Sequence, residues 1–243
     1  MRLWGITDIG MVRRENQDAY AIQEDTPSGH AVCVVCDGMG GPAGGRMASA
    51  IAVETYLAEL VPLLREDMDP RALSLASAQA VSRANAAIRE AAAKTPDYQN
   101  MGTTLVSAIA CAEGAVVSNV GDSRAYCLSG DRCVRITRDH SLVQNMVERG
   151  DITAEEARHH PKRNLITRAL GPDENVECDG FLCRMSSDSL LLLCTDGLTN
   201  MLDDEELRQI LSQGPEGCLE RLVGLAKDRG APDNVTAVLM QWP

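Results

Sequence analysis

The stretch Ala31–Gly41 limits most strongly what this chain can fold into. The six apolar residues Ala31–Cys36 run directly into Asp37, and three of the next four residues are glycine. A short continuous apolar run ahead of turn residues predicts a strand that is buried on both faces. Such a strand brings a carboxylate to the edge of a core, where a charge is costly unless it is paired or bound to metal. We therefore expect Asp37 to form the floor of a metal site, with its other ligands supplied from elsewhere in the chain.

Length and charge restrict the class of protein. The chain of 243 residues is long enough for one large domain with a proper core, and no repeat or linker divides it, so we expect a single domain over 1–243. It carries 35 acidic and 23 basic residues, a net charge of −12. This balance argues against nucleic acid as a partner. No stretch has the length of a signal peptide's apolar region or of a membrane-spanning helix, so we expect a cytoplasmic protein without membrane insertion.

The cysteines are expected to be structural. Nine occur in the chain, and several lie in apolar, strand-like runs. Cys33 and Cys36 have the CxxC spacing of redox and zinc sites. In a strand, however, residues three apart point to opposite faces, and no second CxxC completes a zinc site. We therefore expect reduced thiols that pack as small apolar side chains.

Apolar periodicity divides the chain into blocks of strands and blocks of helices. We expect strands at 3–9, 19–23, 31–36, 104–110, 115–120, 124–128, 132–137, 176–183, 190–194 and 235–241. Helices are expected at 46–64 and 72–94, the second after the start signal Asp69-Pro70, and two more are opened by Asp203 and Pro215. The strands between 104 and 137, with Gly121-Asp122 at one corner, predict an antiparallel meander. Blocks of this kind favour an α+β fold with antiparallel sheets over a βαβ repeat.

The segment 139–170 differs from its surroundings because it is polar and irregular. Gly150 is expected to end one short helix, and Thr153 to Glu156 form a capping box that opens a second. An irregular insert between strands is typical of a surface flap.

Aspartates recur where strands are expected to end, at Asp18, Asp37, Asp122, Asp196 and Asp233. A single Asp-Gly pair is most simply a turn. Here, neither Asp37-Gly38 nor Asp196-Gly197 is followed by a strand-like run, and no cluster of His or Cys competes for the role of a site. Carboxylates that converge without imidazole or thiolate form an all-oxygen site suited to Mg²⁺ or Mn²⁺. Asp37 is the natural bridge between two such ions, since the glycine bend also allows the Gly38 carbonyl to contribute.

Six segments together resemble the metal-dependent protein serine/threonine phosphatases of type 2C. They stand in the family's order, at 13–19, 35–41, 101–105, 119–125, 193–198 and 231–236, and the resemblance spans Leu3 to Leu239. Met39, directly after Asp-Gly, is typical of the bacterial single-domain branch. The resemblance implies a four-layer α-β-β-α sandwich, in which two antiparallel sheets pack face to face with helices outside each.

The resemblance also implies the roles of the acidic residues. Asp37 would bridge two Mn²⁺ or Mg²⁺ ions, and the Gly38 carbonyl would complete the coordination of one of them. Asp196 and Asp233 would hold the other ion. Asp122, together with Asp196, matches the ligands of a third and weaker ion.

Other matched positions lie around these ligands. Arg13 matches the arginine that grips the substrate phosphate, and Asp18 matches a carboxylate that orients metal-bound waters. Asn234, like Asp18, is expected to lie next to the metal ligands without binding metal itself. The segment 139–171 matches the family's flap. Met39 stands where eukaryotic members have a histidine that can protonate the leaving group, so no general acid is assigned. The remaining histidines, expected at the surface or in the flap, are His30, His140, His159 and His160.

The predicted function is a protein phosphatase that hydrolyses phosphoserine and phosphothreonine directly, through a hydroxide bridging two metal ions. Asp37, Asp196 and Asp233 would carry catalysis, and Arg13 would bind the phosphate. The resemblance implies phosphoprotein substrates, among them a Ser/Thr kinase in bacterial signalling, and a monomeric enzyme.

Three alternatives compete with this function. An inactive family member that only binds phosphoproteins is disfavoured because every expected carboxylate is present. The pattern at 38–43 fits G-x-G-x-x-A, but a dinucleotide fold needs another strand within about 30 residues, and here helix follows helix. Asp67-Met68-Asp69 has the spacing of a phosphoaspartate pair, but no strand precedes it.

Overall fold

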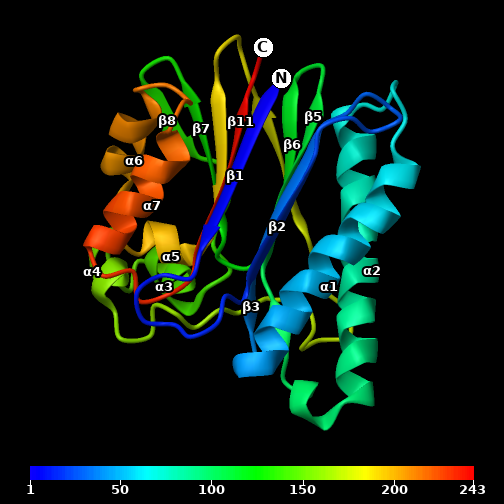
Figure 1. Ribbon diagram of the computed structural model, residues 1–243, viewed down its shortest axis with the longest axis vertical. Coiled ribbons are helices and arrows are strands. Elements are labelled where there is room, and N and C mark those ends of the chain that lie inside the picture. Colours follow the sequence, from blue (N-terminus) through cyan, green and yellow to red (C-terminus); the bar gives the residue numbers. More distant parts are fainter.

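Two antiparallel β-sheets pack face to face in the centre of the molecule, with helices outside each (Figure 1). The computed structural model describes the backbone of residues 1–243 and every side chain except those of Pro42 and Ala43, which end the glycine-rich pattern at 38–43. The first sheet has the order β1 (Arg2–Asp8), β11 (Val235–Gln241), β10 (Leu190–Cys194), β7 (Arg124–Ser129) and β8 (Arg132–Arg135). The second has the order β2 (Asp18–Gln23), β3 (Val32–Met39), β5 (Leu105–Cys111), β6 (Gly114–Val120) and β9 (Asp179–Arg184), with β4 (Gly102–Thr103) paired to β3. The predicted α+β sandwich is confirmed.

The helices cover the outer faces of the two sheets. The second sheet is covered by α1 (Pro42–Leu60) and α2 (Pro70–Lys94), and the first by α6 (Asp204–Leu211) and α7 (Cys218–Asp228), as Figure 1 shows. The shorter helices are α3 (Leu142–Arg149), α4 (Ala154–His159) and α5 (Asp196–Thr199), with 3₁₀ turns at Val61–Leu63 and Pro96–Tyr98. None of the described helices is both long and apolar enough to span a bilayer.

Strand β3 is buried on both faces, as its apolar run predicts. Cys33 and Val35 pack between the two sheets, whereas Val34 and Cys36 pack between the second sheet and its helices. The two cysteines of the CxxC pattern therefore belong to different layers, and all nine cysteines are free thiols. Here the strand lies between the other sheet and its own covering helices, so both of its faces are buried in apolar layers.

The predicted meander is wrong at one corner. β5 and β6 form a hairpin, but β6 then pairs with β9, while β7 pairs with β10 in the other sheet. The chain thus crosses between sheets at Gly121 and Asp122. Gly121 has φ +107°, and a Cβ on it would lie 2.6 Å from Thr104 Cγ2, so only glycine fits this crossover. The turn residues were correctly identified, but they connect two sheets instead of two neighbouring strands.

The glycine bend after β3 is shorter than expected. β3 continues through Gly38 to Met39, the positive φ angles fall at Gly40 and Gly41, and α1 begins at Pro42 instead of residue 46. Gly38 is required for a different reason: a Cβ there would meet the carbonyl oxygen of Gly45. The first turn of α1 therefore packs directly on the end of β3.

Local capping signals predicted most other boundaries. Asp69 accepts a hydrogen bond from the Ala72 N–H (2.7 Å) and caps α2, as expected. In the segment 139–171, Gly150 ends α3 in a left-handed conformation and Thr153 opens α4 with a capping box. Asp203 caps α6 in the same way, whereas α7 begins only at Cys218, after the expected start.

Candidate metal centre

A cleft of about 420 Å³ opens at the end of the sandwich where β3 meets α1. The predicted site residues that line it are Arg13, Asp37, Gly38, Asp122, Asp196 and Asp233. The four carboxylates come from the end of β3, the crossover between the sheets, the start of α5 and the turn before β11. Residues far apart in the sequence therefore line one cleft because strands of both sheets begin or end there.

Asp37 is held rigidly by its neighbours on both sides. The β2–β3 register places Asp18 directly opposite Asp37. The Asp37 N–H donates to Thr104 Oγ1 (2.9 Å), and its carbonyl oxygen accepts from the Thr104 N–H (2.9 Å) and Thr103 Oγ1 (2.8 Å). Both backbone polar groups of Asp37 are thus satisfied, so the backbone that carries the side chain into the cleft is held in place.

Asp122 is followed by two anchored residues. The Ser123 hydroxyl bonds to Thr104 Oγ1 (2.7 Å), which also holds Asp37. Next along the chain, Arg124 forms a double hydrogen bond to the buried Asp139, with Nη2 2.6 Å from Oδ2. The side chains that position Asp37 and Asp122 are therefore linked to each other.

Asp196 and Asp233 approach from the first sheet. Asp196 Oδ2 accepts from Asn200 Nδ2 (3.0 Å), whereas its Oδ1 is buried without a hydrogen-bond partner among the described residues. Asp233 Oδ1 accepts from the Asn234 N–H (2.9 Å), and its Oδ2 accepts from Arg13 Nη2 (2.7 Å). An unpaired buried carboxylate oxygen is costly, so the free oxygen of Asp196 calls for a cation.

Burial and mutual repulsion shift the acidity of the whole cluster. Burial, followed by the charges of the neighbouring aspartates, raises the pKa of Asp37 and of Asp122 well above the usual range. The pKa of Asp196 is raised for the same reasons, and that of Asp18 rises to about 7. Carboxylates that disfavour each other's charge are stabilised together by a bound cation.

The donor chemistry fits Mn²⁺ or Mg²⁺. The available donors are carboxylate and carbonyl oxygens, which hard divalent cations prefer. A Cβ on Gly45 would lie 2.7 Å from the Gly38 carbonyl oxygen, so glycine there keeps that oxygen uncovered. Among the described residues, no three His, Cys, Asp or Glu side chains already stand around one point as a set of ligands. One oxygen of Asp233 is instead paired with Arg13 (2.7 Å).

Asn234 fastens the loop that carries Arg13. Its Oδ1 accepts from the Gln17 N–H (2.8 Å), and its Nδ2 donates to the carbonyls of Ile9 (2.9 Å) and Glu15 (3.0 Å). Arg13 is half-exposed, and its hydrogen bond to Asp233 raises the pKa of the guanidinium, which therefore stays charged. One guanidinium N–H serves Asp233, and the others remain to face the cleft.

Several residues that support the site were not identified from the sequence. Thr103 and Thr104 lie in a matched segment but received no role, and Thr195, whose hydroxyl donates to Asp18 Oδ2 (3.0 Å), was likewise overlooked. The expectation that the histidines lie at the surface or in the flap is wrong for His30, which is buried outside the flap. His140 does lie in the flap segment, but it is buried there. Thr195 directly precedes Asp196, which is a signal that could have revealed it, whereas Thr103 and Thr104 adjoin no aspartate in the sequence.

Comparisons with known proteins agree with this geometry. The family model described as protein phosphatase 2C matches residues 13–222. The serine/threonine phosphatase stp of Listeria innocua is 35% identical over 241 residues, which cover 97% of this chain and 93% of that protein. The crystal structure of the serine/threonine phosphatase Stp1 from Staphylococcus aureus superposes with a TM-score of 0.90 at 34% identity, covering 99% of this chain and 94% of that one.

A third comparison concerns the metal. The catalytic domain of the serine threonine protein phosphatase PstP, solved in complex with two manganese ions, superposes with a TM-score of 0.82 at 33% identity, covering 98% of this chain and 96% of that one. Fold and cleft together define a metal-dependent phosphatase architecture. The chain belongs to the protein phosphatase 2C family.

Proposed function

We propose that this chain is a metal-dependent protein phosphatase that hydrolyses phosphoserine and phosphothreonine in proteins. The observation that carries the proposal is the gathering of four aspartates from both sheets in one cleft, with a buried and unpaired oxygen on Asp196. The family match and the named activities of the similar proteins support the same reaction.

Some residues of the cleft would bind the metal ions, and others would bind the substrate. Asp37, Asp196 and Asp233, with the Gly38 carbonyl, would hold two Mn²⁺ or Mg²⁺ ions, and Asp122 would serve a third. When bound, the ions acidify a water molecule and neutralise charge on the phosphate.

Asp18 would lie next to these ligands and orient metal-bound waters. Its own carboxylate is held by the hydrogen bond that it accepts from the Thr195 hydroxyl. The Arg13 guanidinium would bind phosphate oxygens through its remaining donors.

The segment 139–171 supplies a further wall of the cleft. Asn164 and Ile166, from the second half of this segment, line the cleft together with Arg13 and Met39. We propose that this segment acts as a flap over the substrate, within a single catalytic domain. Met39 cannot donate a proton, so no side chain is assigned as general acid.

The chemistry of the substrate suggests the cellular setting. A phosphoprotein substrate requires a Ser/Thr kinase to form it, so we propose that the enzyme opposes such a kinase in bacterial signalling. Nine free thiols fit a reducing compartment, which supports the cytoplasm as the place of action, and we propose a monomer.

A peptide assay tests the proposed reaction. A phosphothreonine peptide should release phosphate with Mn²⁺, lose this activity in EDTA and regain it when excess Mn²⁺ is added. A matched phosphotyrosine peptide measures the selectivity. Binding of the phosphopeptide without any release of phosphate would instead establish the inactive family member.

Removing the arginine should weaken substrate binding. Because hydrogen bonds to a charged group contribute about 1.5–3 kcal/mol, Arg13→Ala should raise KM for the phosphopeptide by about 10–100-fold with a smaller change in kcat. Arg13→Lys should fall between, since lysine keeps the charge but cannot form two parallel hydrogen bonds. Steady-state kinetics at saturating Mn²⁺ measure both constants, and a change in kcat alone would contradict a binding role.

A further inference from the structure

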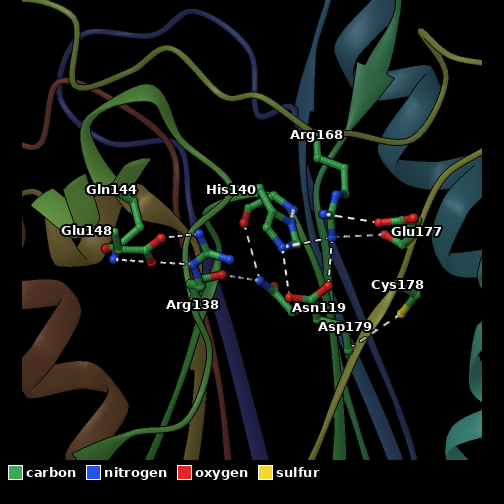
Figure 2. Close-up of polar contacts among 10 residues, drawn as sticks. Asn119, Arg138, His140, Gln144, Glu148, Arg168, Glu177, Cys178 and Asp179 are labelled. Atoms are coloured by element: carbon green, nitrogen blue, oxygen red, sulfur yellow. Dashed lines mark hydrogen bonds and ion pairs between the residues drawn. The ribbon is translucent and has the colours of Figure 1, made fainter. Parts of the chain in front are cut away.

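His140 lies behind the crossover that carries Asp122. Its own N–H donates to the Gly121 carbonyl (2.9 Å), and the Gly121 N–H donates to His140 Nδ1 (3.0 Å). Both backbone polar groups of the residue before Asp122 therefore end on one buried histidine, 5% exposed. The Gly121 carbonyl also accepts from Asn119 Nδ2 (3.3 Å), which belongs to the same cluster (Figure 2).

The contacts of the imidazole determine where its proton lies. Because the Gly121 N–H is a donor, Nδ1 must offer its lone pair, and the ring proton must sit on Nε2. Nε2 lies 3.1 Å from Asp179 Oδ2, which accepts that proton as a hydrogen bond. Arg168 Nη1 also lies 3.0 Å from Nε2, but Nε2 already carries the ring proton. Arg168 Nη1 therefore directs its two N–H groups to the other oxygen of Asp179 (2.7 Å) and to the Glu177 carbonyl (3.3 Å) (Figure 2). Burial lowers the pKa of His140, which agrees with a neutral ring.

The backbone of His140 also contacts the second half of the flap segment 139–171. Its carbonyl oxygen accepts from the Thr167 N–H (2.8 Å), and the next residue, Ser141, pairs with Ile166. Ile166 lines the cleft, as does Asp122. His140 is therefore the point where the crossover, the flap and the start of β9 are joined.

We propose that His140 is a positioning residue for Asp122: its Nδ1 fixes the Gly121 peptide and thereby aims the Asp122 carboxylate, while Asp179 fixes the imidazole. This inference rests on the proposed function, since Asp122 is there a ligand of the third metal ion. Residues that do not bind a metal ion themselves commonly act in this way, because their hydrogen bonds hold a metal ligand in its orientation.

Two substitutions of His140 test the roles of Nδ1 and Nε2 separately. In His140→Asn, the amide oxygen lies near the place of Nδ1 and can still accept from Gly121. In His140→Gln, the amide reaches the place of Nε2 and Asp179 but leaves the Gly121 N–H buried and unpaired. Both variants lose the ring, so a merely structural histidine would give equal effects.

Calorimetric titration of the intact protein with Mn²⁺ measures the result without relying on turnover. His140→Gln should weaken the weakest class of Mn²⁺ sites by about 10–100-fold, and His140→Asn should stay within about threefold of the wild type. Hydrogen exchange of the Gly121 amide should quicken in His140→Gln only. Equal losses in the two variants, or an unchanged isotherm in His140→Gln, would overturn the proposal.

Two further variants complete the test. Asp122→Asn should abolish the same class of sites and so identify it. His30→Asn is the matched control, because His30 is also buried and bonded at both nitrogens, to the carbonyls of Ala110 (2.7 Å) and Arg65 (3.0 Å), at the opposite end of β3. It should lower Tm and leave Mn²⁺ binding unchanged.

The wild type separates this inference from the function on which it rests. A wild type that binds no Mn²⁺ would overturn both together. A wild type that binds Mn²⁺ through Asp122, with an unaffected His140→Gln variant, would overturn the role of His140 alone.

Discussion

Asp37→Asn should lower kcat/KM for a phosphothreonine peptide by about a thousandfold or more, and excess Mn²⁺ should not restore it. Asp37 lines the cleft, and its charge interacts with those of Asp18, Asp196, Asp122 and Asp233. Metal ions that act on a phosphoryl group supply several kcal/mol of transition-state stabilisation, and each ~1.4 kcal/mol corresponds to a factor of ten in rate. Steady-state kinetics over a Mn²⁺ titration measure the loss.

The same substitution should have the opposite effect on the stability of the metal-free protein. Burial and repulsion raise the pKa of Asp37, so its ionised form opposes folding at neutral pH. An amide of the same shape carries no charge, and Asp37→Asn in EDTA should therefore melt at a higher temperature than the wild type. Sites that sacrifice stability for function commonly show this combination.

A surface aspartate provides the control for both measurements. Asp67 lies exposed between α1 and α2, so Asp67→Asn should change neither kinetics nor Tm. This control also tests the phosphoaspartate alternative at Asp67-Met68-Asp69. An Asp37→Asn variant that keeps a tenth of the wild-type activity would contradict the assignment of Asp37 as a metal ligand.

Gly38→Ala should produce the largest loss of stability of any glycine substitution near the cleft. The added Cβ would meet the carbonyl oxygen of Gly45 and lie 2.6 Å from that of Gln17, and both are backbone atoms that cannot rotate away. Overpacking typically costs about 1–3 kcal/mol, and contact with two immobile backbone atoms places this site at the upper end, about 3 kcal/mol. In a chain of this size such a loss lowers Tm by roughly 10 °C, which differential scanning calorimetry would measure.

Gly224→Ala is the matched substitution at an open position. Gly224 lies on the exposed side of α7, and a Cβ there would meet nothing within 4 Å. Alanine in a helix interior is favoured over glycine by about 0.5–1 kcal/mol, so this variant should melt slightly above the wild type. Equal Tm values for Gly38→Ala and the wild type would show that β3 and α1 can separate without cost.

Local signals in the sequence identified those features that depend on neighbours along the chain. The apolar run before Asp37, the cap at Asp69 and the capping box at Thr153 all depend on residues within a few positions of each other. The gathering of the aspartates was also expected, because each follows or precedes a strand. The resemblance to a family then supplied the roles that no spacing can give.

What the sequence did not reveal depends on contacts between distant segments. β6 and β7 are both short apolar strands, and nothing in their periodicity states that they join different sheets, so the crossover at Gly121 was taken for a hairpin corner. His140 was placed outside the site for a similar reason. Its function follows from the peptide it contacts, and that contact exists only once the crossover has formed.

The two sheets contribute different acidic residues to the cleft: Asp18 and Asp37 belong to the second sheet, whereas Asp196 and Asp233 adjoin strands of the first. Cations held between them would tie the halves of the sandwich together at this end. The stability of the folded protein would then depend on the concentration of divalent ions by mass action. In a cell short of manganese, the enzyme would be easier to unfold as well as inactive.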